Sequence, residues 1–269
     1  MSLSGSIYTG LGALTYAAAC ILLVVSNIFS LGFGAELAVY ALLGLTLLML
    51  CIISLKGGEY APAFEFKNSF RLDVFAHLSA ASFIILCALY VFEIYQFVSG
   101  GRFTAFRISV LALLAVLSLF SAFCMASVGM SFGESRYDFR RLKWLSFAPM
   151  LWSIVQMCEL LFNSFQVTLY ASDALKVLCV VCVMCFYYRF SFETLSDSGA
   201  SSHTLFFSGA LPFSAVLFFI ERLMLVLGGK AELFCEDSIF ALALLLMSPF
   251  AFFIRRNILS YSKDSGYAK

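Results

Sequence analysis

The sequence is built from long apolar runs, each about as long as an α-helix that crosses a lipid bilayer. Such a helix needs about 20 largely apolar residues, and it suits the hydrocarbon core because its backbone polar groups are hydrogen-bonded internally. Hydrophobic residues make up 62% of the chain and charged residues 12%, against about 25% charged residues in soluble domains. We therefore predict an all-α, polytopic membrane protein with about eight transmembrane helices, at about 10–29, 36–55, 73–98, 106–130, 144–165, 170–190, 205–227 and 237–254.

Basic residues lie mostly on one side of these predicted spans. With eight spans, one side holds Lys56, Lys67, Arg71, Arg136, Arg140, Arg141, Lys143, Arg189, Arg255, Arg256, Lys263 and Lys269, and the other holds Arg102, Arg107, Arg222 and Lys230. Because cytoplasmic loops carry the excess of Lys and Arg, we predict an integral protein of the cell membrane with both termini in the cytoplasm. The run 170–190 is the weakest span, since Asp173 and Lys176 open it. Seven spans, however, would move the basic C-terminus to the opposite side.

The connections between spans alternate in length, and those on the predicted outer side are shorter. This alternation pairs the spans into four helical hairpins that repeat in the same orientation. We expect them to form a single transmembrane domain over residues 1–269, with hairpins at about 10–55, 73–130, 144–190 and 205–254.

A glutamate recurs near the outer end of the last three hairpins. Glu93, Glu159 and Glu221 are 66 and 62 residues apart, and each lies about 9–10 Å along its helix from the outer loop. An ionised acid in mid-bilayer costs about 2.5–3.5 kcal/mol, so three of them require compensation. In one interpretation they line a polar cavity that binds a small solute, a cation or a proton. Gln156 and Asn163 lie at helical spacing from Glu159 and would contribute to this site.

The alternative interpretation is structural. Each acid has a candidate ion-pair partner at similar depth, namely Arg107, Lys176 or Arg222. Pairs such as Glu93–Arg107 and Glu159–Lys176 would hold the two helices of a hairpin together. Charged residues inside a membrane commonly pair with one another, so the two interpretations are compatible.

The sequence carries no motif that indicates an enzyme. It contains no nucleophile elbow, zinc-protease helix or phosphate-binding loop. Cys179, Cys182 and Cys185 follow one helix face and are better explained as small packing residues than as metal ligands. We predict no metal, cofactor or catalytic residue, and a net charge of +1 gives no nucleic-acid-binding footprint.

Three classes of function remain open. The acids favour binding or transport of a small solute, cation or proton. A membrane sensor is the second class, and a non-catalytic subunit or assembly factor of a membrane complex is the third. The lipid bilayer is the expected surrounding partner, and basic inner segments such as 134–143 could dock lipid head groups or a protein.

Overall fold

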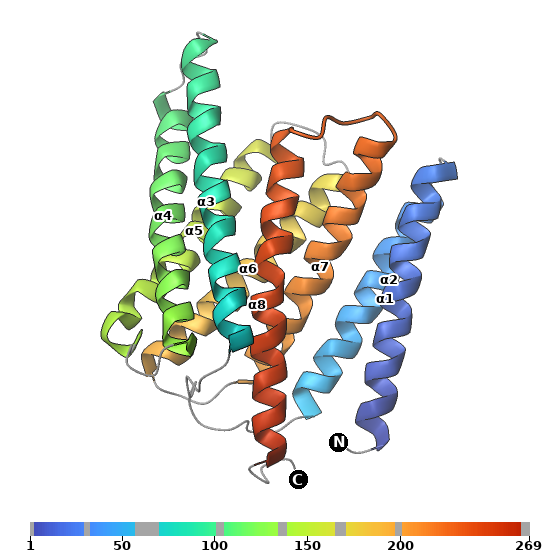
Figure 1. Cartoon of the computed structure of the whole chain (residues 1–269). Helices are drawn as coiled ribbons and strands as arrows, with labels where there is room; N and C mark the ends of the chain where they lie inside the picture. The colour runs from blue at the N-terminus through green and yellow to red at the C-terminus, as the bar shows by residue number, and fades with distance from the viewer. Residues whose placement is uncertain are drawn as a thin grey trace.

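The computed structural model describes residues 3–29, 33–56, 70–100, 105–133, 139–164, 171–196 and 201–264, and within them the chain is helical apart from short turns (Figure 1). The α-helices are α1 (Leu3–Phe29), α2 (Phe33–Lys56), α3 (Phe70–Ser99), α4 (Ala105–Gly133), α5 (Phe147–Ser164), α6 (Ala171–Ser196), α7 (Ser202–Leu227) and α8 (Glu236–Asp264). A short 3₁₀ segment, Phe139–Ser146, leads directly into α5.

All eight of these helices are long and apolar enough to cross a membrane, which confirms the predicted all-α, multi-pass architecture. A helix is the natural form of such a run, because lipid offers its backbone no hydrogen-bond partner. The weakest predicted span is a full helix, α6, whose apolar stretch covers Ala174–Leu195. Its end lies beyond the predicted residue 190 and packs against the 3₁₀ segment, where the Ser191 hydroxyl donates to the Ser146 carbonyl at 2.5 Å.

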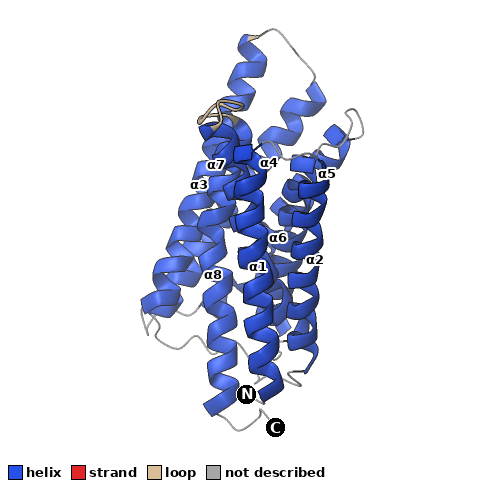
Figure 2. Ribbon diagram, turned by 90° about the vertical axis from the view of Figure 1, so that its right-hand side faces the viewer, coloured by secondary structure: helices blue, strands red, loops and turns tan. Residues whose placement is uncertain are grey.

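Six helices form a closed ring. Each helix from α3 to α8 contacts the next one, and α8 in turn contacts α3. Helices α1 and α2 contact each other and lie against α7, outside the ring (Figures 1 and 2). The two helices of each predicted hairpin are therefore in contact, but only the last three hairpins build the ring. These are the three hairpins that carry the recurring glutamate.

The two ends of the ring differ. Helices α3, α5 and α7 finish at the end that holds the α7–α8 connection, which we call the turn end. The chain termini lie at the opposite end, which we call the termini end (Figure 1). Between them, aromatic side chains fill the ring: Phe83 on α3 contacts Trp152 on α5 and Tyr187 on α6, at 5.2 and 5.9 Å between ring centroids. All three side chains are buried.

Candidate functional site

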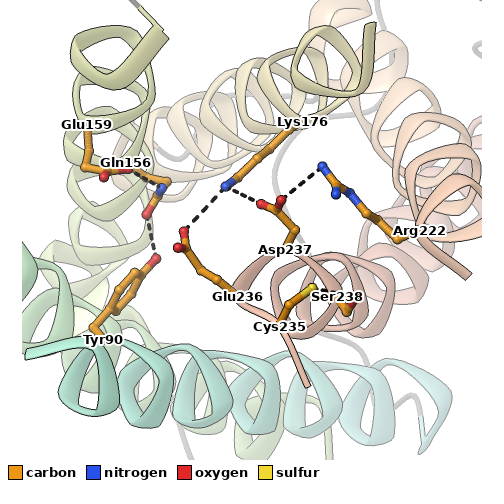
Figure 3. A network of polar contacts seen from close by, with 9 residues as sticks. All are labelled: Tyr90, Gln156, Glu159, Lys176, Arg222, Cys235, Glu236, Asp237 and Ser238. Carbon is orange, nitrogen blue, oxygen red and sulfur yellow. Dashed lines mark hydrogen bonds and ion pairs between the residues drawn. The ribbon is translucent and has the colours of Figure 1, made fainter. Parts of the chain in front are cut away.

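Polar side chains from several helices of the ring gather near its turn end. Figure 3 shows that they point toward one another from α3, α5, α6, α7 and the start of α8. Tyr90, Gln156, Lys176 and Arg222 are buried, although they lie in segments that are otherwise apolar. Buried polar groups are costly unless they are hydrogen-bonded or paired. Their contacts therefore distinguish the groups that have an ion-pair or hydrogen-bond partner from those that do not.

An ion-pair triad of Lys176, Arg222 and Asp237 joins three helices. Asp237 lies in the first turn of α8, where the helix dipole favours an acid. Its Oδ1 lies 2.8 Å from the Lys176 Nζ on α6, and its Oδ2 lies 3.1 Å from the Arg222 Nη2 on α7. Lys176 also lies 3.6 Å from Glu236 Oε1 and above the ring of Phe240. One carboxylate thus compensates two buried cations.

A second set of contacts joins α3 to α5. The Tyr90 hydroxyl donates to Gln156 Oε1 at 2.5 Å, and Gln156 Nε2 donates to Glu159 Oε2 at 3.3 Å (Figure 3). Tyr90 and Gln156 are each 3% exposed, whereas Glu159 is half-buried. Gln156 and Glu159 lie one turn apart on α5, so the amide holds the carboxylate in place.

Glu93 differs from the other acids of the site. It is 8% exposed, and within the described part of the chain it forms no ion pair and its Oε1 accepts no hydrogen bond. Glu236 and Glu159 lie close enough to act on it electrostatically, as do Arg107 and Lys176. The Arg107 guanidinium stacks over Phe97, 4.4 Å from the ring centroid, and forms no ion pair with Glu93. Glu93 therefore faces two acids without a cation in contact.

Two of the predicted cations have a partner that the sequence did not indicate. Lys176 and Arg222 both contact Asp237. Glu221 is half-buried on α7, next to Arg222 in the chain. Asn163 lies in the last turn of α5, and its side chain falls outside the described residues.

Sequence reasoning missed Tyr90, Glu236 and Asp237. The two acids stand at the boundary of the last apolar run, where they look like part of an exposed loop. Their position in the sequence could have indicated them. Two consecutive acids that open a transmembrane helix lie at the same depth as cations near the ends of neighbouring helices. Tyr90 carried no sequence signal, because a tyrosine in an apolar run is unremarkable.

The spacing of these acids limits what the site can bind. Among the described residues, no three His, Cys, Asp or Glu side chains lie close enough together to hold a metal ion. A single carboxyl, in contrast, holds a proton by itself. Comparison with protein-family models, curated proteins and solved structures finds no match for the chain. The proposed function is therefore based on the arrangement of the side chains in this site.

Proposed function

We propose that this multi-pass membrane protein binds a proton or small cation at Glu93, and that this binding serves transport across the membrane. The observation that carries the proposal is the Glu93 carboxyl, which is buried, has an unpartnered oxygen and faces Glu159 and Glu236. An uncompensated charge in such a place is strongly unfavourable. Binding of a proton or cation removes that cost.

The nearby cations are engaged elsewhere, which supports the same conclusion. Lys176 is 2.8 Å from Asp237 Oδ1, and Arg222 also contacts Asp237. Arg107 lies over an aromatic ring. Since the described residues include no group of three or more His, Cys, Asp or Glu side chains that could hold a metal ion, a proton, which a single carboxyl binds, is the ligand that we favour first. Ionisable residues inside a membrane commonly mark proton relays and ion pathways.

The charge distribution supports a cytoplasmic location for the termini end. The described segments at that end carry nine cations and those at the turn end carry four: Lys56, Arg71, Arg140, Arg141, Lys143, Arg189, Arg255, Arg256 and Lys263, against Arg107, Lys176, Arg222 and Lys230. By the positive-inside tendency, the turn end and Glu93 would face the outer side of the cell membrane.

The test compares Glu93→Gln with the wild type in thermal unfolding across a pH series in detergent. Glutamine resembles the protonated carboxyl, so the two midpoints should be close at low pH. As pH rises, the unfolding midpoint of the wild type should fall below that of the variant, because the buried carboxyl ionises less readily in the folded protein than in the unfolded chain unless a cation binds to it. Sodium, potassium or ethylammonium should raise the unfolding midpoint of the wild type at high pH if the site also binds that cation.

Glu232→Gln is the matched control, since Glu232 is an exposed acid at the same end of the molecule. Its midpoint should differ from that of the wild type by the same amount at every pH. The proposal fails if Glu93→Gln behaves like this control. That outcome would favour the sensor or the non-catalytic subunit interpretation.

A further inference from the structure

A second buried carboxyl with an unpartnered oxygen lies near the termini end of the ring. Glu193 on α6 is 2% exposed. Its Oε1 accepts hydrogen bonds from the backbone N–H of Ser201 at 2.9 Å and from the Ser201 hydroxyl at 3.0 Å, and also from the Thr204 hydroxyl. Its Oε2 is buried and has no hydrogen-bond partner among the residues that the structure describes. The carboxyl is thus fixed through one oxygen and available through the other.

Hydroxyl and indole groups lie between Glu93 and Glu193. Near the turn end, the Trp152 side chain lies beside the Tyr90 hydroxyl, and its indole N–H makes no hydrogen bond to a described residue. Nearer the termini end, the Ser79 and Tyr187 hydroxyls are hydrogen-bonded at 3.1 Å between α3 and α6. All four side chains are buried.

These groups follow one another through the ring in a consistent order. On α3, Glu93, Tyr90, Phe83 and Ser79 succeed each other toward the termini end. At 1.5 Å per residue, Glu93 lies about 15 Å from Phe83, and Ser79 lies about 6 Å beyond it. On α6, which runs in the opposite direction, Glu193 comes about 9 Å after the Ser79 partner, Tyr187.

Phe83 separates the two polar segments. It is fully buried and contacts Trp152 in one segment and Tyr187 in the other. A phenyl ring neither donates nor accepts a conventional hydrogen bond, so it interrupts any chain of proton transfers. Movement of this ring would let the two segments meet, and hydrophobic constrictions serve as gates in membrane pores.

We propose that the interior of the ring is a proton pathway that connects Glu93 with Glu193, with Phe83 as the barrier between its two polar segments. This pathway rests on the proposed proton site at Glu93. Each transfer breaks one O–H bond and forms another between the two carboxyls, the Tyr90, Ser79 and Tyr187 hydroxyls and water molecules that enter the intervals between them, while the Trp152 indole N–H only donates a hydrogen bond. The positive charge moves with the proton, and Glu193 Oε2 is the acceptor at the termini end. The close aromatic packing on either side suits a proton better than a hydrated ion.

The test measures proton flux in liposomes that contain a pH-sensitive dye, with potassium and valinomycin fixing the membrane potential. The wild type should acidify the lumen faster than empty liposomes under an inward proton gradient. Glu193→Gln should slow this flux at least about tenfold, because the amide cannot accept and release the proton. Its carbonyl oxygen can still accept the bonds from Ser201 and Thr204, so the fold should be kept.

Tyr187→Phe provides a second variant that keeps the aromatic packing and removes only the hydroxyl, and it should also slow the flux. Tyr188→Phe is its matched control, since Tyr188 is the next residue on α6 and its side chain is 50% exposed. This control should conduct like the wild type.

The outcomes separate the pathway from the Glu93 site. Each substitution should remove only its own carboxyl's share of the pH-dependent stability, so adding Glu93→Gln to Glu193→Gln should reduce that dependence further. If Glu193→Gln and Tyr187→Phe conduct like the wild type, or the wild type conducts no better than empty liposomes, the pathway is refuted and the Glu93 site can still stand. If Glu93→Gln shows no altered pH dependence, the proposed function fails first.

Discussion

Replacement of Asp237 by Asn should destabilise the protein strongly, because it removes the one carboxylate that both Lys176 and Arg222 contact. The amide keeps the shape of the side chain but not its charge, and the two cations are only 8% and 9% exposed. Removal of one partner from a buried ion pair costs about 3–5 kcal/mol. We expect about 3 kcal/mol, since the Asp237 side chain is 32% exposed and Lys176 keeps Glu236 at 3.6 Å.

The neighbouring acid is the matched control for this experiment. The Glu236 side chain is 48% exposed and contacts Lys176 at a longer distance than Asp237 does. Exposed ion pairs contribute about 0–1 kcal/mol, so Glu236→Gln should have little effect. For chains of this size about 2 °C of melting temperature corresponds to 1 kcal/mol, which predicts a decrease of about 6 °C for Asp237→Asn and below about 2 °C for Glu236→Gln.

Both variants can be measured by tryptophan fluorescence during thermal unfolding, at one scan rate and in one detergent. Trp152 is buried inside the ring and reports its opening. Equal shifts for the two variants would contradict the assignment of Asp237 as the residue that joins α6, α7 and α8. An unchanged Asp237→Asn would show that apolar packing alone holds these helix ends together.

Two glycine substitutions test close helix contacts by the same melting assay. Gly129→Ala should lower stability by about 1–3 kcal/mol, because the new Cβ would lie 2.5 Å from His77 Nδ1. Gly209→Ala should cost less, because its Cβ would lie 2.7 Å from Arg255 Nη1, the end of a flexible side chain that can shift. Gly44→Ala is the control: it meets nothing within 4 Å and should be neutral or stabilising by about 0.5–1 kcal/mol. If all three variants melt alike, these contacts do not limit helix approach.

The number of helices follows from the sequence, whereas their arrangement does not. Each apolar run must be helical in lipid, and its length alone makes it a span. Which faces meet is another matter, because a helix that is apolar all round shows no stripe pointing toward its neighbours. The position of the first hairpin against α7, outside the ring, and the contact of α8 with α3 therefore appear only in three dimensions.

The candidate site was predictable in part for a similar reason. Glu93 and Glu159 stand out in the sequence because a charge within an apolar run is costly. The actual partners of Lys176 depend on the closure of the ring, which brings the start of α8 beside α6. No spacing in the chain reveals that Asp237 lies next to a lysine 61 residues earlier.

Under the proposed function, the structural and the ligand-binding interpretations of the buried acids apply to different residues. Asp237 takes Lys176 and Arg222 because it projects from the positive end of the α8 dipole and reaches both cations through separate oxygens. That arrangement satisfies the fold at this end of the ring. It also leaves Glu93 without a cation in contact, facing Glu236 and Glu159. The ion-pair triad engages Lys176 and Arg222 and leaves Glu93 without an ion-pair partner, so the same contacts that stabilise the ring create the condition on which the proposed site at Glu93 depends.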